Sequence, residues 1–283
     1  MSIPIEPSRF LDSVVSLARD AGREIMSIYP AAELLSEKVD HSPLTQADLA
    51  SHHCLVNGLA QLADGVPILS EEAKALPFET RATWDTYWLI DPLDGTKEFL
   101  KRNGEFTVNV ALIHRHVPVL GVVDVPARGV TYFAAEGVGA FRQVDDHPPT
   151  RLGVVQPSAQ PCRVVGSRSH GSDDMSRYLQ RLGEHEMVPV GSSLKFCYVA
   201  EGRADLYPRL GPTSEWDTAA AQCVVEQAGG VVLDLQGQPL RYNTKASLLN
   251  PYFIVAATHS PRWLACADGI DGWRHLEAPS ITR

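Results

Sequence analysis

The pattern of apolar and polar positions divides the chain into a helical start, a central run of strands and a mixed final part. Apolar residues recur at helical spacing over about residues 8–29, and a second helix is predicted after Asp48. Short apolar runs predict strands around Ile68 and Trp88. Antiparallel strands separated by Gly and Pro turns are then predicted at 106–113, 119–125, 130–134 and 140–143.

The segment His147-Pro148-Pro149 interrupts this pattern and predicts a boundary between an N-terminal lobe, residues 1–150, and a C-terminal lobe, residues 151–283. In the second lobe the clearest helix covers about residues 217–228 and is stopped by Gly229-Gly230. Strand runs followed by alternating helices and strands indicate a mixed α+β fold. The short strands of this lobe are predicted at 163–166, 188–190, 230–233 and 252–257.

Composition narrows the class of protein. The 283 residues are 44% hydrophobic, which is enough for a large core. A net charge of -9 argues against a broad nucleic-acid surface. The chain has neither a membrane-spanning apolar run nor the basic, apolar start of a signal peptide. Its five cysteines include no CxxC pair, so we expect reduced thiols in a cytoplasmic protein.

The first candidate site follows the predicted strand 87–90, where Asp91 and Asp94 are separated by Pro92-Leu93. Two carboxylates this close repel each other unless a cation lies between them, and Mg²⁺ prefers oxygen ligands. Gly95-Thr96 then opens a predicted helix, whose backbone N–H groups suit a phosphate. A surface turn is the alternative, because Asp, Pro and Gly are ordinary turn residues.

Two further acidic positions extend this candidate site. Glu71-Glu72 follows the apolar run 66–70, and Asp217 leads into an alanine-rich helix. Each lies at the end of an apolar element or at the start of a helix, so together they predict one metal site assembled from distant segments. For Asp217 the alternative is structural, because Ser214-x-x-Asp217 also fits a capping box.

In this order, the three motifs resemble those of the inositol monophosphatase-like phosphatases, which are Mg²⁺-dependent and lithium-sensitive. The motifs are Glu71-Glu72, residues 91–96 and residues 216–220. The stretches 42–48, 191–196, 211–217 and 242–251 are similar to the 3′(2′),5′-bisphosphate nucleotidase branch, of the bacterial type linked to sulfate assimilation. The resemblance covers about Ser13 to Thr258. It implies a layered α-β-α-β-α sandwich of the inositol monophosphatase and fructose-1,6-bisphosphatase type.

The resemblance also implies a metal centre with two or three Mg²⁺ ions. Its ligands would be the side chains of Glu71, Asp91, Asp94 and Asp217 and the backbone carbonyl of Leu93. Most of them would lie in the N-terminal lobe, whereas Asp217 and the substrate-binding segments would lie in the C-terminal lobe.

Four polar residues are candidates for positioning water at this centre. The Thr96 hydroxyl would orient the attacking water together with Glu71, and Asp48 would support a further metal ion or its water. Both Thr96 and Asp48 could instead cap the helices that follow them. Glu72 would assist through water, or is simply a solvated surface acid.

The substrate contacts are predicted from the same stretches. Lys195 and Arg209 are candidates for a second phosphate, and Glu215 could accept from a ribose hydroxyl or orient Lys195. The complete predicted set is Gly95, Thr96, Gly191, Ser192, Lys195, Arg209, Glu215 and Asp217.

These inferences predict an Mg²⁺-dependent enzyme that hydrolyses the 3′-phosphate of adenosine 3′,5′-bisphosphate (PAP) to AMP and phosphate. Its sulfated relative PAPS, which would give APS, is a further candidate substrate. Inositol-1-monophosphatase is the closest alternative, because it shares all three metal motifs. A non-catalytic metal or nucleotide sensor is less supported, since neither Thr96 nor any ligand is missing. Glycoside hydrolysis by the carboxylate pair would give no role to the Gly95-Thr96 anion site.

The expected location is the cytoplasm, with a peripheral position at the inner face of the cell membrane as a second option. The expected partner is a small nucleotide bisphosphate and not a nucleic acid, and a homodimer is left open.

Overall fold

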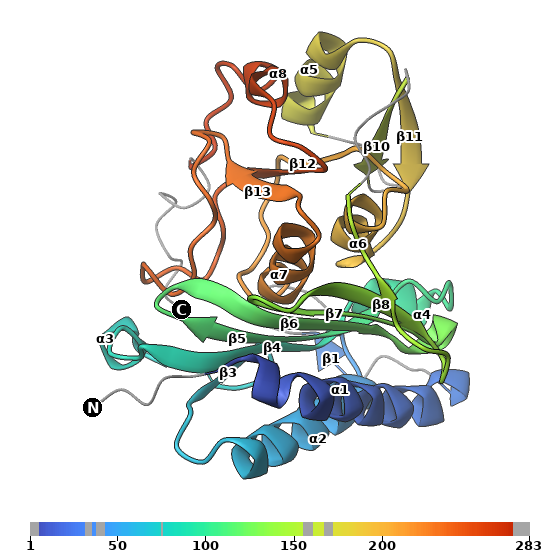
Figure 1. Ribbon diagram of the computed structural model, residues 1–283, viewed down its shortest axis with the longest axis vertical. Coiled ribbons are helices and arrows are strands. Elements are labelled where there is room, and N and C mark those ends of the chain that lie inside the picture. The colour runs from blue at the N-terminus through green and yellow to red at the C-terminus, as the bar shows by residue number, and fades with distance from the viewer. Residues whose placement is uncertain are drawn as a thin grey trace.

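The computed structural model describes residues 6–31, 36–37, 43–74, 76–154, 161–166 and 172–273. Ser42, in one of the predicted substrate stretches, lies outside these ranges. Five layers are visible in Figure 1, and they confirm the predicted α-β-α-β-α sandwich. In order, the layers are helices α1 (Ser8–Ile28) and α2 (Gln46–Leu62), a seven-stranded sheet, helices α6 (Leu194–Ala200) and α7 (Ala219–Gln227), a five-stranded sheet, and helices α5 (Asp173–Leu182) and α8 (Pro261–Ala265).

The seven-stranded sheet has the order β3-β4-β5-β6-β7-β8-β9. Only its first pair, β3 and β4, is parallel. The last strand follows the predicted lobe boundary but still pairs with β8, so the chain leaves this sheet after Arg151. The strands are β3 (Ile68–Ser70), β4 (Thr86–Asp94), β5 (Thr107–His114), β6 (Val117–Val125), β7 (Val130–Ala135), β8 (Gly139–Val144) and β9 (Thr150–Arg151).

The five-stranded sheet has the order β11-β10-β12-β14-β13. Strand β10 is parallel to both of its neighbours, whereas β14 is antiparallel to β12 and β13. Strand β12 is not among the predicted strands, because it is short and contains Pro208, a residue that weakens a strand prediction. The strands are β10 (Cys162–Gly166), β11 (His185–Pro189), β12 (Leu206–Arg209), β13 (Val231–Asp234) and β14 (Phe253–Ala256).

The remaining elements are short. Strands β1 (Ser36–Glu37) and β2 (Pro43–Leu44) pair with each other. Helices α3 (Phe78–Arg81) and α4 (Thr96–Leu100) flank β4 in the sequence, and two 3₁₀ turns cover Tyr29–Ala31 and Pro126–Arg128. None of the helices in the described ranges is long and apolar enough to span a membrane.

Alternation along β4 determines which face of the large sheet each side chain covers. Trp88 and Ile90 belong to the cluster packed under α1 and α2, whereas Tyr87 and Leu89 belong to the cluster shared with α6 and α7. The next residue of that second face is Asp91. Strand β4 therefore places the Asp91 carboxylate in the layer between the two sheets, where α7 lies.

Helix α7 packs directly on the large sheet at Gly121 of β6. A Cβ atom at this glycine would lie 2.2 Å from the carbonyl oxygen of Ala220. Any side chain here would therefore push α7 away from the sheet. The absence of a side chain at Gly121 thus fixes how close the N-terminal end of α7 lies to β4 and β5.

Candidate metal and catalytic site

The register of β4 and β5 shifts between Asp91 and Asp94, so that Pro92 and Leu93 form a bulge. Leu93 packs into the cluster under α1 and α2, and the Leu93 N–H donates to Asp91 Oδ1 at 3.0 Å. Helix α2 supports the bulge through Ser51, whose hydroxyl donates to the Pro92 carbonyl at 2.6 Å. The bulge therefore re-aims the end of the strand into the site.

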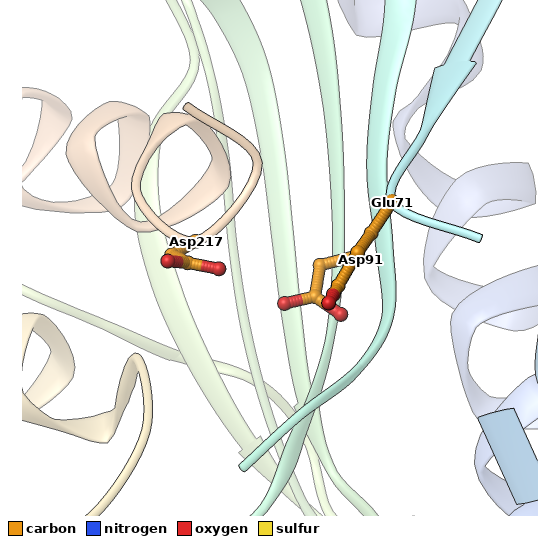
Figure 2. A group of neighbouring side chains, drawn as sticks. All are labelled: Glu71, Asp91 and Asp217. Atoms are coloured by element: carbon orange, nitrogen blue, oxygen red, sulfur yellow. The ribbon is translucent and has the colours of Figure 1, made fainter. Parts of the chain in front are cut away.

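Glu71, Asp91 and Asp217 each offer a carboxylate oxygen within 4.8 Å of the other two. Figure 2 shows these carboxylates pointing toward one another, with Asp217 coming from the turn that precedes α7. Glu71 directly follows β3, and its N–H donates to the Ile90 carbonyl at 3.2 Å, which holds it beside β4. Asp91 is buried and the other two are partly buried, and such a group of hard oxygen donors is the chemistry that Mg²⁺ prefers, so these residues fit the predicted metal ion.

The electrostatics of this group also favour a cation. Burial raises the pKa of the Asp91 carboxyl well above its usual range, and the charges of Glu71, Asp94 and Asp217 raise it further. Removal from water, followed by the charges of Asp94 and Glu71, raises the pKa of Asp217 to about 8. Without a cation, Asp91 and Asp217 therefore resist losing their protons near neutral pH.

Asp94 lies beside the three carboxylates but is also held by Ser193. Its Oδ2 accepts from the Ser193 N–H at 2.6 Å and from the Ser193 hydroxyl at 2.5 Å. The side chain of Asn109 donates to the same hydroxyl at 2.7 Å. The role of Asp94 and of the Leu93 carbonyl as metal ligands stays a prediction.

Thr96 and Asp48 meet inside the site. The Thr96 hydroxyl lies 3.3 Å from Asp48 Oδ1 and 3.4 Å from the Leu93 carbonyl oxygen. The other oxygen of Asp48 accepts from the N–H and the hydroxyl of Thr45, at 2.7 and 2.6 Å. Asp48 thus connects the start of α2 with the start of α4.

The alternative role for Thr96 and Asp48 was to cap the helices that follow them. Neither residue is an N-cap. Helix α2 begins at Gln46 rather than after Asp48, and Thr45 is its N-cap in a capping box whose third helical residue is Asp48. Helix α4 has Gly95 as its N-cap, in a left-handed conformation with φ 92°. The Thr96 hydroxyl is therefore not used to cap its helix.

We expect Thr96→Ala to lower kcat more than it raises KM. Positioning of the attacking water matters mainly in the transition state, so a loss of roughly 100-fold or more is expected. Steady-state kinetics of the alanine and serine variants check this, because Thr96→Ser keeps the hydroxyl and should retain much of the activity. An unchanged kcat in Thr96→Ala would show that the hydroxyl has no part in the reaction.

The site opens into a cavity of about 180 Å³. Typical small-molecule pockets measure roughly 300–1,000 Å³, so this cavity fits the reacting end of a substrate and leaves its bulk outside. The lining residues are all predicted from the sequence except Lys97 and Glu98. They are Glu71, Asp91, Leu93, Asp94, Gly95, Thr96, Lys97, Glu98 and Asp217.

The predicted loop Gly191-Ser192 lies against this cavity. A Cβ atom on Gly95 would lie 3.4 Å from the Ser192 Cβ, and the Gly191 N–H donates to Glu105 Oε2 at 2.9 Å. Ser192 has φ 46°, a left-handed conformation that a non-glycine residue seldom adopts. Ser192 and Gly95 thus lie side by side, as they must if both contact the same substrate.

The two predicted phosphate-binding cations already have partners within the protein. Lys195 is 8% exposed, and its ammonium donates to the Ser192 carbonyl at 3.1 Å. Arg209 donates to the Thr213 hydroxyl and to the Pro212 carbonyl. Arg209 nevertheless lies close enough to lower the pKa of Asp217 slightly.

Glu215 differs from its predicted surroundings, because it pairs with Lys245 and not with Lys195. Its carboxylate is 0% exposed and accepts from Lys245 Nζ at 3.2 Å and from the Asn243 N–H at 2.8 Å. Burial raises the pKa of Glu215, and the charge of Lys245 opposes that shift. The predicted contact between Glu215 and a ribose hydroxyl would have to compete with both of these donors.

The predicted stretch 242–251 encloses the segment that carries Asp217. Asn250 Nδ2 donates to the Ser214 carbonyl at 2.9 Å and to the Thr218 hydroxyl at 3.0 Å. Arg81 of α3 is 2% exposed and donates to the Asn243 side chain. We refer to residues 242–250 together with Arg81 as the clamp.

The Ser214 N–H donates to Asp217 Oδ2 at 2.9 Å, although α7 begins only at Ala219.

Ser193, Arg81 and Lys97 have no individual role among the predictions from the sequence. Ser193 lies in a stretch of small residues that was singled out, so a signal for it existed. Arg81 precedes its partner Asn243 by 162 residues, and no local pattern connects them. Lys97 follows Thr96 directly and lines the cavity.

Residues 6–266 match the inositol monophosphatase family, and the chain belongs to this family. It is 50% identical over 248 residues to the 3′(2′),5′-bisphosphate nucleotidase CysQ of Escherichia coli, covering 87% of this chain and 99% of the relative. The crystal structure of CysQ from Bacteroides thetaiotaomicron superposes with a TM-score of 0.78 at 41% identity, over 90% of this chain and 98% of that one. The Thermotoga maritima IMPase gives a TM-score of 0.72 at 25% identity, over 87% and 91%.

Proposed function

We propose that this protein is a Mg²⁺-dependent phosphatase that hydrolyses the 3′-phosphate of PAP to give AMP and phosphate. The observation that carries the proposal is the convergence of Glu71, Asp91 and Asp217 beside the Thr96–Asp48 pair in one cavity. The nucleotide rather than inositol phosphate is favoured by the identity to the bisphosphate nucleotidases named CysQ. PAPS is a further candidate substrate.

The residues of the site have distinct tasks in this proposal. Glu71, Asp91 and Asp217 hold Mg²⁺, with Asp94 and the Leu93 carbonyl as further predicted ligands. Bound Mg²⁺ offsets the charge of the phosphate and lowers the pKa of water. Thr96 accepts a hydrogen bond from the attacking water while its own hydroxyl donates to Asp48, with Glu71 as the predicted partner in orienting that water. The second phosphate remains outside the metal centre and serves as a handle.

The decisive test compares PAP with inositol 1-phosphate as substrates of the purified protein in Mg²⁺. We expect faster hydrolysis of PAP, with 5′-AMP as the nucleotide product, and loss of activity in EDTA that added Mg²⁺ restores. A preference for inositol 1-phosphate would instead identify the alternative activity. A release of 5′-phosphate would contradict the proposed orientation of the nucleotide.

Inhibition by lithium is expected from the resemblance to the lithium-sensitive phosphatases and not from the chemistry of the site residues. If Li⁺ replaces a weakly held Mg²⁺, PAP hydrolysis should fall at sub-millimolar to millimolar lithium, whereas equal concentrations of Na⁺ should have little effect. Activity that persists at much higher lithium concentrations would contradict this expectation.

Several finer expectations accompany the proposal. Two or three Mg²⁺ ions per site, a homodimer and a role in sulfur metabolism stay predictions. A cytoplasmic location agrees with the five cysteines, all of which are free. No described residue supports the peripheral membrane position, so it is not part of the proposal.

A further inference from the structure

Charge is distributed unevenly around the cavity. Its lining includes five carboxylates, Glu71, Asp91, Asp94, Glu98 and Asp217, but within the described residues Lys97 is its only basic side chain. Metal ions can balance the inner carboxylates and the phosphate that reacts. A second phosphate on the same substrate lies beyond those ions and needs its own cation.

Lys97 has the properties that this second contact requires. It is the second residue of α4, next to Thr96, and its side chain is exposed while lining the cavity. Within the ranges that the structure describes, its ammonium has no ion pair or hydrogen bond. A lysine ammonium on a flexible stem can therefore move onto a ligand without breaking an existing contact.

Two other cations, Lys195 and Arg209, were predicted for this role. Unlike Lys97, both already have hydrogen-bond partners within the described part of the protein. The ammonium of Lys195 is buried against the Ser192 carbonyl, and the guanidinium of Arg209 is bound to Thr213 and Pro212. Both cations keep spare N–H donors, but these contacts limit how far each can move toward a phosphate, whereas Lys97 has no such restraint from the residues that the structure describes.

We propose that Lys97 binds the substrate phosphate that is not hydrolysed and so sets the preference for nucleoside bisphosphates over monophosphates. This inference rests on the proposed function, because it takes the reacting group to be the 3′-phosphate at the metal centre. The small cavity supports it, since a volume of about 180 Å³ leaves the rest of the nucleotide at the rim, where Lys97 is exposed.

The test measures kcat/KM of the wild type and of Lys97→Met on PAP and on 3′-AMP. These substrates share the reacting phosphate and differ only in the 5′-phosphate. Lys97→Met should lose about tenfold on PAP, mainly through KM, and less than about twofold on 3′-AMP. Lys97→Arg should keep most of the preference, and the preference of the wild type should shrink as salt is added.

Lys101→Met is the matched control. Lys101 lies one helical turn further along, is exposed and does not line the cavity, so its loss should leave both substrates unaffected. Equal losses of Lys97→Met on both substrates, or no loss on PAP, would overturn the role of Lys97. A wild type that hydrolyses neither nucleotide would refute the proposed function itself, before any variant is compared.

Discussion

Asp91→Asn should abolish turnover and at the same time stabilise the metal-free protein. The Asp91 carboxylate is 1% exposed and belongs to the group of three carboxylates within 4.8 Å. In the proposed metal centre, its negative charge helps to hold a divalent cation. Residues that only hydrogen-bond to metal ligands typically cost about 10–100-fold when mutated, so loss of a ligand should cost more than about 100-fold.

The gain in stability follows from the raised pKa of Asp91. A carboxyl whose pKa is higher in the folded than in the unfolded state favours folding at low pH, and this contribution is lost as pH rises through the folded pKa. The metal-free wild type should therefore lose stability as pH rises through the neutral range, where Asp217, with its pKa of about 8, also ionises. Asparagine at position 91 removes part of that loss.

Thermal unfolding in EDTA and in Mg²⁺, over a pH series, measures both effects. Mg²⁺ should raise the Tm of the wild type, because it binds only the folded state, and should have much less effect on Asp91→Asn. Asp64→Asn, at an exposed turn outside the cavity, is the control and should match the wild type in activity and Tm. Full activity of Asp91→Asn in chelator would rule out the metal mechanism.

Lys245→Met should destabilise the protein by about 3 kcal/mol. Removal of one partner from a buried ion pair leaves the other charge without compensation, at a cost of roughly 3–5 kcal/mol. Glu215 is 0% exposed and Lys245 is 23% exposed, so we expect the lower end of this range. The Mg²⁺ concentration for half-maximal activity should also rise, because Glu215 precedes the predicted metal ligand Asp217 by two residues and is held by Lys245 and Asn243 of the clamp.

A double-mutant cycle with Glu215→Gln tests the cause of this loss. Glutamine keeps an oxygen that can accept from the Asn243 N–H but carries no charge, so Glu215→Gln/Lys245→Met should be more stable than Lys245→Met alone. Urea unfolding of the metal-free proteins gives the free energies, and Lys101→Met controls for loss of a surface lysine. Strictly additive effects would show that Glu215 and Lys245 are not coupled in solution.

The elements of the large sheet could be predicted because each has its own local pattern. Strands such as β5 and β6 are mostly apolar runs bounded by turn residues, and α1 has an apolar stripe with helical spacing. Element ends were less predictable. Helix α2 begins two residues before Asp48 because Thr45 supplies the N-cap, and the alternative that placed Asp48 there was wrong.

The candidate metal ligands could be proposed from the sequence because carboxylates follow apolar runs, where strand ends expose them to a common cavity. Their support could not be predicted. The partner of Glu215 is Lys245, 30 residues away, and Asn243 is held by Arg81, 162 residues away. Such pairs depend on how the two sheets pack together. The spacing of residues within one segment does not indicate which distant residues will pair.

Close packing of α7 on Gly121 allows substrate preference to change without a change in the spacing of the site carboxylates, during evolution or redesign. The distance of Asp217 from β4 depends on the close approach of Gly121 to the Ala220 carbonyl, in which the side chains of Lys97, Glu98 and Ser192 take no part. New substrate preferences can therefore be sought in libraries at Lys97, Glu98 and Ser192 while the hydrolytic centre is inherited intact. Libraries that include Gly121 should return almost exclusively glycine among active clones.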